Sequence, residues 1–222
     1  MKLVIGNKNY SSWSLRPWLV LKHTGAPFEE EVIPLEHLDT ASRISRYSGA
    51  GRVPVLIDGP LTVWDSLAIG EYLNERFPQA QLWPKDSAAR AVARSVSAEM
   101  HSGFPDLRND LSMRMRSTFA PRPLRKQAKA DVDRVQSIWR ECRQRFGEKG
   151  SGPFLFGAFS IADAMFAPVV SRFRTYSVPM DPVCTTYANA VWSLPSLQEW
   201  FASAQKETFP APEHERDAPP PL

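Results

Sequence analysis

Hydrophobic and polar residues in the first third of the chain alternate with two different periods. Short apolar runs bounded by turn residues are typical of strands, whereas hydrophobic positions three or four residues apart are typical of helices. Glycine, proline and asparagine separate the runs. The predicted elements are a strand at 2–6, a helix at 15–23, a strand at 28–34, two strands at 55–57 and 61–64, and a helix at 66–77.

This order predicts a thioredoxin-like N-terminal domain over residues 1–78. A strand, helix, strand unit favours a parallel pair, and the two strands around Asp58-Gly59-Pro60 favour an antiparallel hairpin. Ser14 is expected to cap the first helix. Residues 35–51 show no period and are expected to be irregular.

Beyond this domain the pattern is helical throughout. Prolines bracket a predicted linker at 79–85, and 86–208 predicts an all-helical domain, so the fold class is α/β plus all-α. Ser160 and Asp163 precede an apolar run at the spacing of a capping box, which predicts a helix start. Residues 209–222 contain five prolines and are expected to form a flexible tail.

Composition narrows the classes of function. The chain has 222 residues and a net charge of +3 with both signs interspersed, which does not favour nucleic-acid binding. The two cysteines, Cys142 and Cys184, cannot form a CxxC pair or a structural zinc site, and no metal site is predicted. No apolar run approaches membrane-spanning length and no signal peptide pattern opens the chain, which predicts no membrane partner and a reducing, cytoplasmic location.

The candidate chemistry begins at the Val53-Pro54 step. Motifs for phosphate-binding loops, zinc hydrolysis and the serine-hydrolase elbow do not occur in the sequence. Proline lacks an N–H and pushes the preceding residue to an extended conformation, so the Val53 backbone is expected to lack a full set of sheet partners. We therefore predict that it pairs with something else, such as the backbone of a small peptide.

Two hydroxyl-bearing helix starts are expected to face this step across a groove. Asp65-Ser66 opens the helix after the hairpin, where free N–H groups receive a carboxylate. Ser11, Ser12 and Ser14 lie between the first strand and the first helix. One interpretation of these serines is helix capping, and the sharper one is that a hydroxyl donates a hydrogen bond to a bound anion.

Four segments together resemble the glutathione S-transferase family. The resemblance spans residues 1 to about 208, with both domains in the family's order. The N-terminal hydroxyls are most similar to the serine-type classes, especially to a zeta-like Ser-Ser-x-Ser pattern. The segments are Ser11-Ser12-Trp13-Ser14-Leu15-Arg16, Gly51-Arg52-Val53-Pro54-Val55-Leu56, Asp65-Ser66-Leu67-Ala68-Ile69 with Tyr72-Leu73, and Phe159-Ser160-Ile161-Ala162-Asp163.

The resemblance implies that glutathione is bound as a co-substrate. Pro54 would follow a cis peptide bond, and Val53 would pair its backbone with the cysteinyl part of glutathione. Ser66, with Asp65, would hold the γ-glutamyl end. A homodimer is also implied.

The resemblance further implies that one N-terminal serine stabilises the glutathione thiolate. Ser11 is indicated by alignment, with Ser12 and Ser14 as close rivals. Arg52 and His37 are candidates for the glycyl carboxylate or the backbone nearby. The implied activity is transfer of the sulfur to a small apolar electrophile; the alternatives are a glutathione-dependent isomerase of the maleylacetoacetate type and a non-catalytic binding protein on the same scaffold.

The chain departs from the family pattern at two positions. Asp65 stands where Glu or Gln is commoner, and Trp13 stands where a zeta-like enzyme carries cysteine, which weakens the isomerase alternative. Apolar residues of the helical domain could form the electrophile pocket, although ordinary core packing is the favoured interpretation of each. These residues are Met100, Phe104, Phe166 and Phe173.

Overall fold

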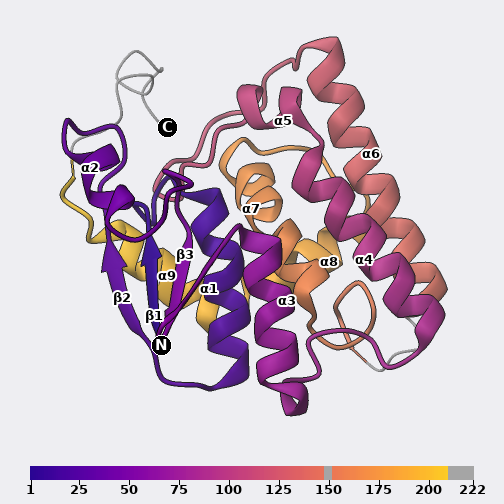
Figure 1. Cartoon of the computed structure of the whole chain (residues 1–222). Coiled ribbons are helices and arrows are strands. Elements are labelled where there is room, and N and C mark those ends of the chain that lie inside the picture. The colour runs from indigo at the N-terminus through magenta and orange to yellow at the C-terminus, as the bar shows by residue number, and fades with distance from the viewer. Residues whose placement is uncertain (148–151, 210–222) are drawn as a thin grey trace.

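A four-stranded mixed sheet organises the N-terminal domain of the computed structural model, which describes residues 1–147 and 152–209. The strand order is β2-β1-β3-β4, with β1 parallel to β2 and antiparallel to β3, and β3 antiparallel to β4. This topology confirms the thioredoxin-like prediction (Figure 1). The bounds are β1 Lys2–Ile5, α1 Ser12–Thr24, β2 Glu29–Val32, α2 Thr40–Ser45, β3 Val55–Asp58, β4 Leu61–Trp64 and α3 Ser66–Arg76.

Different helices bury the two faces of the sheet. Successive side chains of a strand point to opposite faces. Leu3 and Ile5 therefore join the main core with α1 and α3, whereas Val4 packs in a smaller cluster that contains Ile44 of α2. The prediction that 35–51 is irregular was wrong at α2, because a six-residue helix with one buried residue has no apolar period to detect.

The C-terminal domain consists of helices, as predicted, and α1 packs against both α3 and α7 at the junction of the two domains (Figure 1). Two short elements had no sequence signal: the six-residue α5 and the π-helical turn η2. The bounds are η1 Pro78–Ala80, α4 Ser87–Ser102, α5 Pro105–Asp110, α6 Lys126–Cys142, η2 Arg143–Gly147, α7 Ile161–Thr175, α8 Pro182–Trp192 and α9 Pro195–Gln205.

Helix α7 forms the centre of the helical domain. Most of its residues are buried, and its Phe166 and Phe173 pack against Trp139 of α6. Met100 and Phe104 lie in the same core. The core interpretation of these four apolar residues is therefore confirmed.

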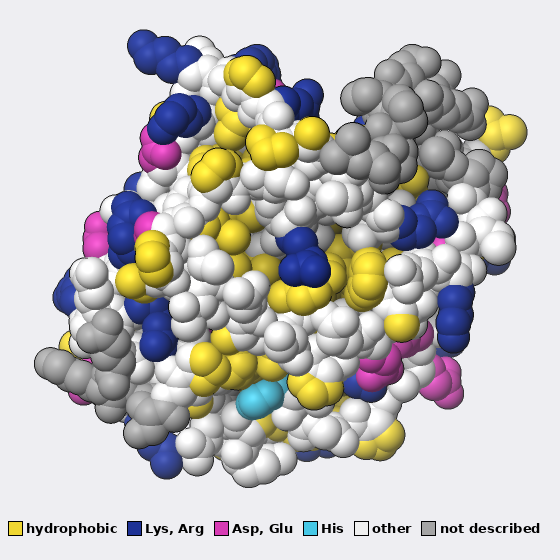
Figure 2. Space-filling model, turned by 180° about the vertical axis from the view of Figure 1, so that it is seen from behind, with side chains coloured by type: hydrophobic (Ala, Val, Ile, Leu, Met, Phe, Trp, Pro, Cys, Tyr) yellow, Lys and Arg dark blue, Asp and Glu magenta, His cyan; other side chains and the backbone are white. Residues whose placement is uncertain are grey.

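The described part of the face seen in Figure 2 does not gather charge of one sign. On the described part of the face opposite to that of Figure 1, Lys and Arg side chains are scattered singly among hydrophobic and acidic ones (Figure 2). Within 1–147 and 152–209, no helix has the length and apolar character needed to cross a bilayer. Residues 210–222 of the predicted tail lie outside the described residues.

Candidate functional site

The Val53 backbone at the entrance to β3 is unpaired. Its peptide bond to Pro54 is cis, as the resemblance implied. Neither the N–H nor the C=O of Val53 makes a hydrogen bond to another residue of the described chain. Pro54 is buried, whereas Val53 is half-buried. A free donor and acceptor on one extended residue can pair with a peptide as an added strand does.

Asp65 and Ser66 form the start of α3. Asp65 caps the helix, with Oδ1 accepting from the N–H groups of Leu67 at 2.9 Å and Ala68 at 3.1 Å. Its φ of 75° is unusual for a residue other than glycine, and such backbone conformations cluster at functional sites. The Ser66 hydroxyl is enclosed and has no hydrogen-bond partner among the described residues, so it is free to bind a ligand group.

The three N-terminal serines differ in how they are engaged. The Ser14 hydroxyl is buried and accepts from the Gly6 N–H at 3.0 Å and from the Ser11 hydroxyl at 2.7 Å. Ser11, and not Ser14 as predicted, caps α1, because its Oγ accepts from the Ser14 N–H. Ser12 is the first residue of α1, and its hydroxyl makes no hydrogen bond within the described chain.

A cleft of about 470 Å³ brings most of the predicted site residues together. This volume is in the range of small-molecule sites. From α1 only Trp13 lines the cleft; the three serines lie next to it in sequence but not in the lining. His37, another predicted site residue, is also not among the lining residues. The lining residues are Trp13, Ala50, Arg52, Val53, Pro54, Trp64, Asp65, Ser66 and His101.

His101 of α4 is a cleft residue that the sequence analysis missed. Its Nε2 lies 2.9 Å from Asp65 Oδ2, and its ring meets Trp13 edge-on with 5.2 Å between centroids. Burial lowers the pKa of His101, and Asp65 opposes that shift. A neutral His101 therefore donates to Asp65. A histidine near the end of a helix carries no sequence signal for a contact with another domain.

Arg16 is a buried cation beside the cleft. Its guanidinium lies 4.3 Å from the Trp13 ring centroid, and the guanidinium of Arg108 lies 4.7 Å from the same ring. None of the three side-chain nitrogens of Arg16 has a hydrogen-bond partner in the described chain. Burial lowers the pKa of Arg16, and the charges of Arg108 and Arg172 act in the same direction. Two guanidinium groups thus contact the indole of Trp13, which lines the cleft, while neither arginine is itself among the lining residues.

A larger hollow of about 1070 Å³ lies elsewhere, near the end of α3 and the start of α4 and α7. His23, Trp83 and Phe159 are among its lining residues, and none of the predicted site residues is. Its size does not make it the better candidate, because the one hydroxyl among its described lining residues, that of Ser160, already donates to Asp163.

Comparison with known families agrees with the geometry. The family "Glutathione S-transferase, N-terminal domain" matches residues 10–76, and "Glutathione S-transferase, C-terminal domain" matches residues 122–203. The first range contains every predicted site residue, because Ser11 and Ser66 both fall inside it.

Individual relatives give matches of different extent. The chain is 35% identical to a probable maleylacetoacetate isomerase of Caenorhabditis elegans over 98 residues. This aligned stretch covers 44% of this chain and 45% of that protein. The matches to the first three curated relatives each span less than half of the relative's length. Glutathione S-transferase T1 of Arabidopsis thaliana is 30% identical over 171 residues, 73% of this chain and 69% of its own.

A solved structure extends the similarity to nearly the whole chain. It is a glutathione transferase homologue from Burkholderia with bound glutathione, at a TM-score of 0.70 and 26% identity. The alignment covers 93% of this chain and 98% of that one. From the two family matches, the extent of these relatives and the shared fold, we conclude that the chain belongs to the glutathione S-transferase family.

Proposed function

We propose that this cleft binds glutathione and that the protein transfers the glutathione sulfur to a small electrophile. The observation that carries the proposal is the free Val53 backbone facing the same cleft as the unpartnered Ser66 hydroxyl. The glutathione bound in the Burkholderia homologue supports it, because that protein shares the fold over almost its full length.

Each part of the tripeptide has a partner of suitable chemistry. The cysteinyl backbone pairs with the N–H and C=O of Val53, and the γ-glutamyl carboxylate accepts from Ser66 at the positive end of α3. Asp65 offers a carboxylate to the ligand ammonium, although His101 already occupies one of its oxygens. Arg52 lines the cleft and suits the glycyl carboxylate, whereas His37 has no place in the lining.

Ser12 is our choice for the hydroxyl that donates to the sulfur. Ser11 gives its proton to Ser14, and Ser14 is buried against Gly6. Ser12 has no such engagement among the described residues, and its position as the first residue of α1 places it at the positive end of the helix dipole, which favours an anion.

The hydroxyl has a limited energetic task. A free thiol of pKa about 8.5 is roughly 3% thiolate at pH 7, and lowering the pKa by about two units raises the thiolate roughly 25-fold. The less basic thiolate is about 6- to 10-fold less nucleophilic, so the net gain is only a few-fold. Positioning of the electrophile beside the sulfur supplies the remainder.

A specific observation favours the isomerase alternative as the second candidate. The buried charge of Arg16, with Arg108 on the same indole, favours an electrophile that carries an anionic group over a purely apolar one. The apolar side chains of the helical domain that were candidates for an electrophile pocket, such as Phe166, lie in the core. The probable maleylacetoacetate isomerase among the relatives is consistent with this candidate.

The test is an ultraviolet titration of the thiolate of bound glutathione. In wild type we expect a pKa well below that of free glutathione, and in Ser12→Ala a return toward the free value. The matched control is Ser42→Ala, which alters a serine of the exposed part of α2. A pKa equal to the free value in wild type would leave a binding protein without thiol activation, and a failure to bind would refute the site. A shift that survives Ser12→Ala but not Ser11→Ala would assign the role to Ser11.

A further inference from the structure

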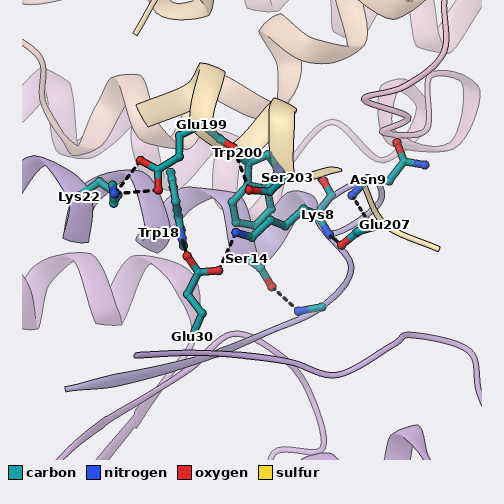
Figure 3. A network of polar contacts seen from close by, with 11 residues as sticks. Lys8, Asn9, Ser14, Trp18, Lys22, Glu30, Glu199, Trp200, Ser203 and Glu207 are labelled. Atoms are coloured by element: carbon teal, nitrogen blue, oxygen red, sulfur yellow. Dashed lines mark hydrogen bonds and ion pairs between the residues drawn. The ribbon is translucent and has the colours of Figure 1, made fainter. Parts of the chain in front are cut away.

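The turn that leads into α1 is held by residues about 190 positions away in the sequence. The indole Nε1–H of Trp200 in α9 donates to the Lys8 carbonyl at 2.8 Å. Just beyond α9, the Glu207 carboxylate accepts from two consecutive backbone groups: Oε1 from the Lys8 N–H and Oε2 from the Asn9 N–H at 3.0 Å. Figure 3 shows the Glu207 carboxylate next to the backbones of Lys8 and Asn9, with Trp200 at the other end of Lys8.

A second segment, residues 115–116, also binds the turn. The Met115 N–H donates to the Asn9 carbonyl at 3.2 Å, and the Arg116 N–H donates to Asn9 Oδ1 at 3.0 Å. The Arg116 guanidinium also donates to the Glu207 carbonyl at 2.9 Å. The backbones of Lys8 and Asn9 are therefore paired with the helical domain and not with their own sheet.

The turn at residues 7–9 leads directly into α1. The Asn7 carbonyl accepts from the N–H groups of Tyr10 at 3.1 Å and Ser11 at 2.8 Å. The helix begins at Ser12, immediately afterwards. The Ser12 hydroxyl therefore follows directly on residues 7–9, whose backbone Glu207, Trp200 and Met115 all contact.

We propose that Glu207 is a positioning residue, which fixes the turn so that the start of α1 faces the bound thiol. This inference rests on the proposed function of Ser12. A single carboxylate that accepts two successive N–H groups defines the direction of both peptide planes, which a water molecule in the same place does not. Thiol activation would then require a residue of the segment after α9, outside both matched family ranges.

The experiment compares three full-length variants. Glu207→Ala removes the acceptor, and Glu207→Gln keeps the size but offers only one acceptor oxygen, so it tests the pairing without leaving a gap. Glu199→Gln is the matched control: Glu199 also joins α9 to α1, by an ion pair with Lys22 at 2.7 Å, but does not touch the turn (Figure 3).

Two readouts are combined. Amide hydrogen exchange in a peptide covering residues 7–14 reports the turn without glutathione. The pKa of the bound thiol and the separate values of kcat and KM report its effect on the site. We expect both Glu207 variants to accelerate exchange at least tenfold, to raise the thiol pKa toward the free value and to lower kcat more than they raise KM. Glu199→Gln should leave exchange, the thiol pKa, kcat and KM unchanged.

The outcomes separate the two proposals. Unchanged exchange in both Glu207 variants would overturn the inference, and so would faster exchange with an unchanged thiol pKa, because Glu207 would then be structural only. If wild type does not lower the thiol pKa, the proposed function fails, and the positioning role fails with it even where exchange responds. If Glu207→Ala does not fold, the same criteria apply to Glu207→Gln.

Discussion

Asp65 uses one carboxylate for two contacts. Oδ1 caps α3, while Oδ2 meets His101 across the domain junction and faces the cleft. A capping aspartate alone stabilises a helix start by about 1 kcal/mol. To show that Asp65 also binds ligand, the effect of its substitution must be compared with that of an aspartate that only caps a helix.

Asp86 provides that comparison, since its Oδ1 caps α4 by accepting from the Ala89 N–H at 2.8 Å. We expect Asp65→Ala and Asp86→Ala each to lower the free energy of unfolding by about 1 kcal/mol. Only Asp65→Ala should weaken glutathione binding, by roughly ten- to a hundredfold, because a hydrogen bond to a charged group is lost. Calorimetric titration and urea unfolding measure the two effects. Equal affinity in both variants would remove Asp65 from the site.

Arg16 gives a second prediction at this scale. Replacing a buried charge that lacks a partner by an apolar residue of similar length is commonly neutral or stabilising by about 1–4 kcal/mol. Arg16→Met should therefore unfold at a higher urea concentration than wild type, while its kcat/KM for carboxylate-bearing electrophiles falls relative to neutral ones. A clear loss of stability would mean that a water or another group satisfies Arg16.

At the scale of the element, α7 depends on a buried capping box. Asp163 accepts from the N–H of Leu155 at 3.0 Å and from the N–H of Ser160 at 2.8 Å. Burial raises the pKa of Asp163 from 3.8 to about 6, although these hydrogen bonds oppose the shift. The native state thus retains a proton that the unfolded chain releases between these two values.

The sign of the pH dependence follows. The contribution of Asp163 to the free energy of unfolding should fall by about 3 kcal/mol in total as the pH rises from about 3 to about 7, most steeply between the two pKa values, and stay constant above that window. Asp163→Asn cannot titrate, so the difference in unfolding free energy between wild type and this variant should show that fall. Urea unfolding across the pH range measures it. A difference that grows with pH would mean that the carboxylate, and not the acid, is the native form.

At the scale of the whole molecule, the cleft lies where the N-terminal domain meets α4, and its tryptophans report on it. Trp13 is 37% exposed and Trp64 is 55% exposed, and both line the cleft. Trp18, Trp139 and Trp200 are buried in the core. Ligand binding should therefore change the fluorescence of Trp13 and Trp64.

We expect glutathione to quench the intrinsic fluorescence and Trp64→Phe to remove a large part of the change. Trp192→Phe is the matched control, because Trp192 lies on α8 against Phe201 and away from the cleft. Titration of the three proteins under one set of conditions measures the effect. Equal quenching in wild type and Trp64→Phe would place the ligand away from β4.

The elements and the family could be predicted from short stretches of sequence. The turn Asp58-Gly59-Pro60, the Val53-Pro54 step and the Ser160–Asp163 box each carry their own signal within a few residues. Leu3 and Ile5 on one side of β1 and Val4 on the other likewise mark the two faces of the sheet. Local rules suffice here because caps, turns and periodic burial involve neighbours in the chain.

The composition of the site was decided by the tertiary structure. His101 meets Asp65, Arg16 lies under Trp13, and Glu207 holds the turn before Ser12. Which serine is free also depended on contacts, since Ser14 bonds to Gly6 and Ser11 replaces it as the cap. The sequence alone thus determined the order of the sheet and the main helices, the turn between β3 and β4, and the starts of α3 and α7. Only folding decided which side chains surround them, because residues far apart in the chain meet through packing that no local pattern encodes.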